Sequence, residues 1–202
     1  EWSNFTKFFA QNFELLGLKK LISTSYAPDS KKFKAGYQLT LFETEAPQFD
    51  PQKTQTHGKI FVLNRDVTSD NRIDINDLQW QYLEGDGDFR SNEIKALRDK
   101  ADIIVTNPPF SLMKEFIPLV MESGKQFLVL GNVNHVTFKE IFHRFKSNEM
   151  WLGYHSGHFW FRVPDYYEEK NTDFKIDEHG QKWRRMGNIC WFTNMDIQKR
   201  HE

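Results

Sequence analysis

Cysteine is almost absent from this chain of 202 residues, since Cys190 is the only one. An intrachain disulfide is therefore excluded, and the composition favours a reducing, cytoplasmic location. The formal net charge is only −1, so binding to a nucleic acid would need a local cluster of Lys and Arg. No apolar run approaches the roughly 20 residues that cross a membrane as a helix. Two classes are thus excluded, the disulfide-stapled secreted domain and the membrane protein of spanning helices.

Aromatic side chains are plentiful, at 15% of the residues with 19 Phe and 6 Trp. A chain of this length buries one substantial core, and such an aromatic content leaves rings to spare for contact with flat ligands. The sequence begins at Glu1 without an initiating Met. We therefore expect residues 1–202 to form one domain that is a fragment of a longer protein.

The first half of the chain predicts a helix, a strand and an insertion. Phe residues recur at spacings of three and four within residues 3–18, with Ser3 as the cap and Gly17 as the stop, which predicts a helix. Residues 19–26 are typical of a buried strand. Two short alternating segments at 37–42 and 59–63 predict a hairpin with a long connection, so we expect an insertion near residues 37–78.

The second half alternates between strand and helix patterns with short turns. We expect helices at 91–100, 111–123 and 138–145, and strands at 102–106, 126–130, 150–154 and 188–193. Such an order predicts an α/β fold in which a mostly parallel sheet is covered by helices on both faces.

The most informative motif is Asn107-Pro108-Pro109-Phe110, which follows the expected strand 102–106 and precedes a helix that Ser111 is expected to cap. Ligands of open α/β sheets bind at the carboxyl ends of strands. The two prolines have a fixed φ and no N–H, so the loop is stiff and rich in acceptors. The side-chain oxygen of Asn107 and the carbonyl of Pro108 can accept the two N–H groups of one amino nitrogen. A plain strand-ending turn is the alternative, although such a turn does not need Phe110.

Several segments resemble the family of EcoRI-type adenine-specific DNA methyltransferases: SNFTKFFAQNFELLGLKKLI, GDGDFRSNE, ADIIVTNPPFSL, FLVLGNVNHVTFKEIF and GQKWRRMGNICWFTN. The resemblance spans nearly the whole chain and is far more specific than the tetrapeptide alone. It implies a Rossmann-like sheet, S-adenosyl-L-methionine as cofactor and double-stranded DNA as substrate. It also implies that the first cofactor strand lies upstream of Glu1.

The resemblance implies roles for the site residues. Asn107 and Pro108 would orient the amino group of a flipped adenine, Pro109 would stiffen the loop, and Phe110 would stack on the base. By the same likeness the cofactor would be held by residues at the N-terminus and in the Gly-Asp run: Trp2, Ser3, Asn4, Asp86, Asp88 and Phe89. Asp86 and Asp88 are equally good candidates for the adenine of the cofactor. A solvated Gly-Asp turn and a frayed helix cap are the alternatives for these two segments.

One dense basic cluster, Lys182, Arg184 and Arg185 around Trp183, suits contact with DNA phosphates, with a charged hairpin turn as the alternative. We expect the DNA-contacting region near residues 150–187. Within it, four residues alternate as in a strand and can face the DNA: His155, His158, Trp160 and Arg162. Asn132 and Asn134 either line the base pocket or cap the helix that follows.

Residues 66–77 imitate a calcium loop, with Asp66, Asp70, Asp74 and Asp77 at suitable spacings. Thr68 stands at the third position and the final Glu is replaced by Asp77, so we interpret the segment as a polar connection and expect no metal.

The sequence therefore predicts a site-specific, restriction–modification type adenine methyltransferase that acts on DNA as a monomer. Two alternatives remain open at this stage. The first is a protein-glutamine N-methyltransferase, because the amide nitrogen of glutamine is as poor a nucleophile as the amino nitrogen of adenine. A catalytically inactive DNA-binding module would keep the fold without the reaction.

Overall fold

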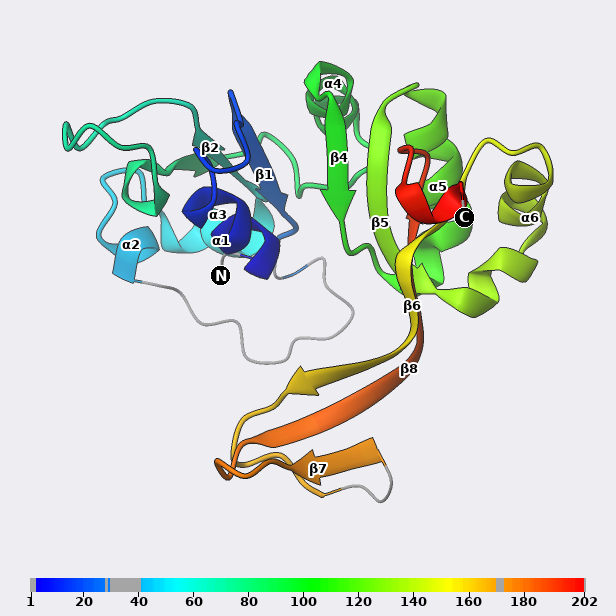
Figure 1. The fold of residues 1–202 in the computed structure, drawn as a ribbon. Coiled ribbons are helices and arrows are strands. Elements are labelled where there is room, and N and C mark those ends of the chain that lie inside the picture. Colours follow the sequence, from blue (N-terminus) through cyan, green and yellow to red (C-terminus); the bar gives the residue numbers. More distant parts are fainter. Residues whose placement is uncertain (1–2, 28, 30–40, 170–172, 202) are drawn as a thin grey trace. The chain divides into compact units, whose positions relative to one another are not determined.

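The computed structural model describes residues 3–27, 29, 41–169 and 173–201. The chain divides into two compact units, Glu1–Lys100 and Ala101–Glu202, which are described separately (Figure 1). No helix in the described ranges is long and apolar enough to cross a membrane.

The first unit has a sheet of three strands, β1 (Leu21–Ser25), β2 (Lys59–Leu63) and β3 (Gln79–Tyr82), in the order β1-β2-β3. Both pairings are antiparallel. The unit also contains the helices α1 (Asn4–Gln11), α2 (Leu41–Thr44), α3 (Pro51–Thr56), α4 (Asn92–Lys100) and the 3-10 turn η2 (Ile75–Asp77). β1, β2 and α4 agree with the strands and the helix expected there.

The helix expected at 3–18 is shorter in the structure. α1 begins after Ser3, whose side chain accepts the backbone N–H of Thr6, and it ends at Gln11. Gly17 adopts a φ of 63° at the end of the turns that follow, as a stop residue should. Ala10 and Phe13 are buried in a core with residues from β2, β3 and the turn before β3: Phe61, Leu63, Leu78 and Trp80.

The hairpin expected between 37–42 and 59–63 is wrong for the described residues. Leu41 and Phe42 lie in helix α2, and residues 37–40 lie outside the described residues. β2 pairs with β1 along one edge and with β3 along the other. Because both edges of β2 are occupied, no edge remains for a further strand at that position.

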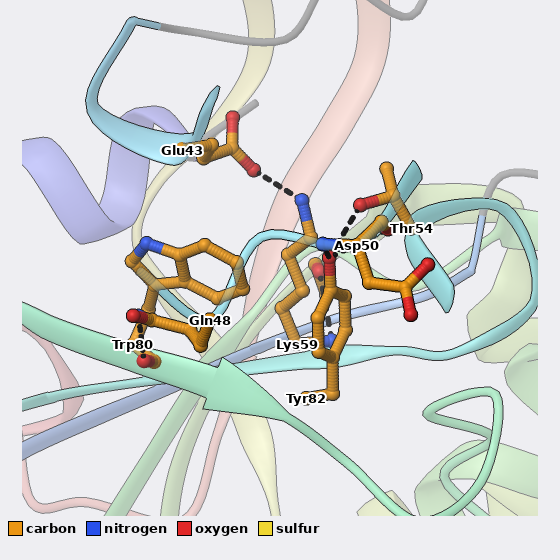
Figure 2. Close-up of polar contacts among 8 residues, drawn as sticks. Glu43, Gln48, Asp50, Thr54, Lys59, Trp80 and Tyr82 are labelled. Atoms are coloured by element: carbon orange, nitrogen blue, oxygen red, sulfur yellow. Dashed lines mark hydrogen bonds and ion pairs between the residues drawn. The ribbon is translucent and has the colours of Figure 1, made fainter. Parts of the chain in front are cut away.

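A buried ion pair lies inside the first unit (Figure 2). The Lys59 Nζ lies 2.7 Å from Oε1 of Glu43, and both side chains are almost wholly inaccessible to solvent. Alternation along β2 places Lys59 on the same face as Phe61 and Leu63. The ammonium lies 4.9 Å from the ring centre of Trp80, so an aromatic face and a carboxylate replace its water.

A hydroxyl network lies beside this pair (Figure 2). The Tyr82 hydroxyl lies 2.6 Å from Oγ1 of Thr54, donates to the Asp50 carbonyl at 3.0 Å and accepts the Asp50 N–H at 3.0 Å. The Gln48 amide donates to the carbonyl of Trp80 at 2.7 Å. These bonds attach the loop around α3 to β3.

The second unit has a five-stranded sheet built from β4 (Ile103–Thr106), β5 (Gln126–Asn132), β6 (Trp151–Arg162), β7 (Phe174–Ile176) and β8 (Lys182–Thr193). The order is β4-β5-β8-β6, and β7 pairs with β8. Two helices, α5 (Met113–Glu122) and α6 (Lys139–Lys146), contact each other. Buried apolar residues come from both helices and the central strands, among them Ile117, Phe127, Ile141 and Phe192.

The expectation of a mostly parallel sheet needs correction. Only β4 and β5 form a parallel pair among the described strands, and the first unit's sheet is wholly antiparallel. The reason is that β8 lies between β5 and β6 and runs against both. β4, β5 and β6 therefore share one direction although they are not all neighbours. What the structure shows is a mixed α/β fold.

Gly131 of β5 allows close packing in this sheet. A Cβ at Gly131 would lie 2.6 Å from the ring of Phe192 on the neighbouring strand. The ring fills the space beside β5 that a side chain would take, so we attribute the Gly at this position to packing.

The expected strands at 150–154 and 188–193 are present but much longer. β6 and β8 each run for 12 residues and continue past the part of the sheet next to the helices (Figure 1).

The helix expected at 111–123 begins instead with a 3-10 turn, η3 (Phe110–Leu112), and Ser111 does not cap it. Pro109 precedes this turn and accepts the N–H of Leu112 through its carbonyl, so the backbone closes the turn without a side chain.

Candidate active site

The motif Asn107-Pro108-Pro109-Phe110 begins directly after β4, at its carboxyl end. Asn107 and Pro109 are exposed, Pro108 is buried and Phe110 is half-buried. β5 runs parallel to β4, so its carboxyl end lies at the same edge of the sheet. The structure thus presents the Asn107 side chain to solvent at an edge where α/β proteins bind ligands.

The carboxyl end of β5 adds a second polar group to this edge. The Asn132 side chain accepts the N–H of Asn134 at 2.9 Å and so caps the 3-10 turn η4 (Val133–Thr137). The N–H of Asn132 donates to Nδ1 of His135 at 3.2 Å. The expectation that Asn132 or Asn134 caps the helix near Phe138 is wrong, because α6 begins after Phe138 without a side-chain cap. Asn132 caps the preceding turn η4 instead.

Phe110 is braced by a histidine that the sequence analysis missed. The ring centres of Phe110 and His135 are 5.3 Å apart and their planes meet at 87°, an edge-to-face contact. His135 packs in turn against Phe138 and Phe192. Burial lowers the pKa of His135, and its Nδ1 accepts a hydrogen bond, so both features favour the neutral imidazole. No spacing in the sequence marks this residue, because the contact joins loops after two different strands.

The first unit has a comparable edge. β1 and β3 both run antiparallel to β2, so they share a direction and their carboxyl ends lie together. The N–H of Ala27 donates to the carbonyl of Asp86 at 2.7 Å. Gly87 has a φ of 85°, and a Cβ there would lie 2.5 Å from the Ser25 carbonyl oxygen. Only glycine fits this approach, which holds the Gly-Asp loop against the end of β1.

The two candidate aspartates of this loop differ in their surroundings. Asp88 forms an ion pair of 2.7 Å with Arg90 and accepts the Tyr26 hydroxyl at 3.3 Å. The Arg90 hydrogen bond lowers the pKa of Asp88, with burial acting in the opposite direction. Asp86 accepts the N–H of Asp88 at 3.0 Å. Phe89 is half-buried, with the Arg90 guanidinium 5.4 Å from its ring centre.

Tyr26 is a second residue that the sequence analysis missed. Burial raises the pKa of its hydroxyl, and the charges of Asp88 and Asp86 raise it further, so the phenol stays protonated and donates. The hydrogen bond joins the loop after β1 to the loop after β3. Its position at the end of the expected strand 19–26 was the available signal.

Of the expected N-terminal residues, Trp2 lies outside the described residues. Ser3 caps α1, and its hydroxyl also lies 2.9 Å from the hydroxyl of Thr6. Thr6 in turn contacts the hydroxyl of Ser23 at 2.6 Å, which ties the start of α1 to β1. Asn4 is exposed in the first turn. The cap interpretation is correct for Ser3, and a role toward a cofactor stays a prediction.

The basic cluster Lys182, Arg184 and Arg185 belongs to strand β8, so the hairpin-turn interpretation is wrong. Lys182 donates to the carbonyl of Asp165 at 2.7 Å, and Arg185 pairs with Asp173 at 2.7 Å. The four alternating residues from His155 to Arg162 lie in β6, as expected.

The calcium-like loop is closed by its own backbone. The Asp77 carboxylate accepts the N–H groups of Val67, Thr68 and Asp74 at 2.7, 2.9 and 3.0 Å. Asp66 likewise accepts backbone N–H groups, those of Ser69 and Asn71. Among the described residues, no group of three or more acidic, His or Cys side chains is arranged to hold a metal. The carboxylates therefore serve the polar connection.

We expect the variant Asp77→Asn to unfold at a lower temperature than the wild type at pH 7. Hydrogen bonds from Asp74, Thr68 and Val67 lower the pKa of Asp77 to about 2. Because the folded pKa lies below the unfolded value of about 3.9, the contribution to stability is full above pH 4 and is lost as the pH falls toward 2. Between pH 2 and pH 7, the unfolding temperature of the variant should change less with pH than that of the wild type.

Asp70→Asn is the matched control on the same loop, because its carboxylate accepts one backbone N–H, that of Arg72 at 2.9 Å. It should lower the unfolding temperature at pH 7 less than Asp77→Asn does. Equal losses in the two variants would contradict the assigned role of Asp77.

Comparison with known proteins identifies relatives of the whole chain. The family described as "Adenine-specific methyltransferase EcoRI" matches residues 1–202. The Type II methyltransferase M.EcoRI of Escherichia coli is 38% identical over 202 residues, which cover 99% of this chain and 56% of the relative. The Type II methyltransferase M.MpnI of Mycoplasma pneumoniae is 35% identical over 197 residues, 96% of this chain and 50% of the relative.

A third relative, the Type II methyltransferase M.MgeORF184P of Mycoplasma genitalium, shows the same 35% identity over 197 residues and the same coverage. The chain spans about half the length of these curated relatives. No solved structure gives a significant match.

Proposed function

Because the chain belongs to the family of EcoRI-type adenine-specific methyltransferases, we propose that it carries the base-side half of a DNA adenine N6-methyltransferase site. The substrate is adenine in double-stranded DNA, flipped out of the duplex, in a site-specific reaction of the restriction–modification kind. The observation that supports this most is the exposed Asn107 at the carboxyl end of β4, beside a stiff Pro-Pro loop and a braced aromatic ring.

The reaction depends on hydrogen-bond acceptors for the adenine amino group more than on a general base that removes a proton. The amino nitrogen of adenine is a weak nucleophile, because its lone pair is delocalised into the ring. In the proposed mechanism, the side-chain oxygen of Asn107 and the carbonyl of Pro108 accept its two N–H groups and favour the pyramidal nitrogen. Burial of Pro108 and the fixed φ of both prolines hold these acceptors in advance of binding. The methylated nitrogen then loses a proton easily to water.

Phe110 holds the base in this mechanism. Stacking of a base on an aromatic side chain is worth roughly 1–3 kcal/mol, which offsets part of the few kcal/mol that base flipping costs. The edge-to-face contact with His135 restricts the rotation of the Phe110 ring, which is half-buried. His135 is thus a positioning residue.

The cofactor is proposed to be S-adenosyl-L-methionine, which supplies a methyl group activated by a sulfonium. The loop after β3 fits one end of that molecule, because it offers carboxylate acceptors suited to an adenine amino group and a half-buried ring at Phe89. We propose Asp86 or Asp88 as the acceptor. Trp2, Ser3 and Asn4 are proposed to lie near its amino-acid tail.

The finer features of the fold belong to the same proposal. We propose that residues 1–202 form a catalytic domain with a Rossmann-like sheet, helices on both faces and an insertion near 37–78. Three strands of one direction in the second unit, with β8 reversed among them, support this. We further propose that the enzyme acts as a monomer.

The test is transfer of an isotopically labelled methyl group from S-adenosyl-L-methionine to duplex DNA by the full-length protein. We expect the label in N6-methyladenine after digestion to nucleosides. Label in a protein glutamine would favour the amide methyltransferase instead. DNA binding without any transfer would favour the inactive module, and either result would overturn the proposal.

A further inference from the structure

The second unit extends into a three-stranded arm formed by the outer parts of β6 and β8 together with β7 (Figure 1). β8 is the central strand of this arm, because β6 pairs with it along one edge and β7 along the other. Partners directly opposite each other in antiparallel strands have side chains on the same face, and neighbours along a strand alternate. The pairing register therefore sorts every side chain of the arm onto one of two faces.

The register gives the two faces different residues. Trp160 is opposite Arg185, while Trp183 is opposite both Arg162 and Lys175. We call these five the tryptophan face. Arg184 is opposite both Phe161 and Phe174, and Lys182 is opposite Ile176. We call these five the phenylalanine face. The cluster Lys182, Arg184 and Arg185, contiguous in sequence, is thus divided between the faces.

The cations of the phenylalanine face already have partners. Lys182 donates to the carbonyls of Asp165 and Tyr167 at 2.7 and 3.4 Å. Arg184 donates to the Tyr167 hydroxyl, and its guanidinium lies 5.3 Å from the ring centre of that residue. Both side chains therefore hold residues 163–169 against this face of the arm. That segment carries three exposed carboxylates, Asp165, Glu168 and Glu169.

The tryptophan face is organised differently. The Lys175 ammonium lies 4.5 Å from the ring centre of Trp160, and neither Lys175 nor Arg162 forms an ion pair in the described part of the chain. Both cations are exposed. Arg185 pairs with Asp173, and the indole N–H of Trp183 donates to Asp177 at 2.8 Å.

The two faces differ in the cations that they leave available. The described residues of the tryptophan face include three cations and the two carboxylates Asp173 and Asp177, with which Arg185 and Trp183 already interact. On the phenylalanine face, Lys182 and Arg184 are both engaged by residues 163–169. A duplex carries its negative charge on the phosphates, so the exposed cations of the tryptophan face are better placed to bind it.

We propose that the arm contacts double-stranded DNA through its tryptophan face, with Arg162 and Lys175 each bound to a backbone phosphate. Trp160 positions Lys175 by holding its ammonium over the indole ring. Lys182 and Arg184 build the arm and do not contact DNA. Phosphate contacts position a protein on the duplex without reading its sequence, so this surface holds the DNA while other groups read the bases. The inference rests on the proposed function.

The experiment measures affinity of the full-length protein for a duplex oligonucleotide over a series of salt concentrations. The test variant is Arg162→Gln with Lys175→Gln, and the matched control is Lys182→Gln with Arg184→Gln, which removes the same charge from the other face. Each phosphate contact contributes roughly 0.9 to the slope of log K against log salt, so the test variant should reduce its magnitude by about 2. The affinity for duplexes of unrelated sequence should fall by the same factor as the affinity for a duplex that contains the sequence which the enzyme methylates.

The control variant should keep the wild-type slope, and its unfolding temperature shows how far the arm depends on residues 163–169. An unchanged slope in the test variant, or an equal reduction in the control, would overturn the inference while leaving the proposed function standing. A wild-type protein that neither binds nor methylates duplex DNA would overturn the proposed function, and the inference with it.

Discussion

Replacement of Asn107 by alanine is expected to lower the rate of methyl transfer to DNA by about 10²–10³-fold, the usual effect of removing one preorganised polar group that acts on the reacting atoms. The Asn107 side chain is exposed after β4. Its loss therefore removes an acceptor for the adenine amino group without removing core packing. The rate constant should fall much more than the affinity for DNA, because the acceptor acts most strongly on the pyramidal nitrogen of the transition state.

Three measurements isolate this effect. Single-turnover kinetics gives the rate of the chemical step, calorimetry gives the affinity for S-adenosyl-L-methionine, and thermal unfolding checks the fold. Asn76→Ala is a matched control, because Asn76 is an exposed residue of the turn η2 in the other unit. The Asn76 variant should transfer methyl groups at the wild-type rate. The Asn107 variant should bind the cofactor with the wild-type affinity. Transfer by the Asn107 variant within threefold of the wild type would refute the mechanism.

The second large effect is expected from Lys59→Met, which should destabilise the protein by about 3–5 kcal/mol. Glu43 and Lys59 are almost completely buried and 2.7 Å apart, so the variant removes the Lys59 cation from a buried carboxylate of the first unit (Figure 2). Removal of one partner of a buried ion pair costs several kcal/mol, whereas replacement of both partners by apolar side chains of similar volume costs little. The double variant Lys59→Met with Glu43→Leu should therefore recover most of the loss.

Urea unfolding of the two single variants and the double variant forms a thermodynamic cycle for the pair. The exposed pair of Arg185 and Asp173 provides the comparison, because such pairs contribute only about 0–1 kcal/mol. Arg185→Met should thus have a small effect on stability. A loss below about 1 kcal/mol for Lys59→Met would show that water or another group stabilises Glu43.

Much of the local structure follows from patterns within short windows. The motif Asn107-Pro108-Pro109-Phe110 lies at the end of β4 as expected, and α4 and β5 occupy the segments predicted for them. The cap at Ser3 and the turn at Gly17 also agree with prediction. Each of these features depends on residues close together in the chain, where periodicity, caps and φ preferences act.

The errors have a common cause. The segment 37–42 alternates in polarity like a strand, yet β1 and β3 occupy both edges of β2, and Leu41 and Phe42 lie in α2. Ser111 resembles a cap, but the turn after Pro109 delays the helix to Met113. A short pattern is compatible with more than one structure, and the choice depends on which partners are available.

By itself, the sequence determined the family, the order of most elements and the position of Asn107 at the end of a strand. The tertiary structure decided which distant groups meet: Phe110 with His135, Tyr26 with Asp88, and Lys59 with Glu43. It also decided that Arg185 faces away from Lys182 and Arg184 on the arm. The physical reason is that the alternation of side chains along one strand shows only which of them share a face of the sheet. Which side meets a helix, a carboxylate or a DNA phosphate depends on hydrogen-bond register with strands far away in the chain.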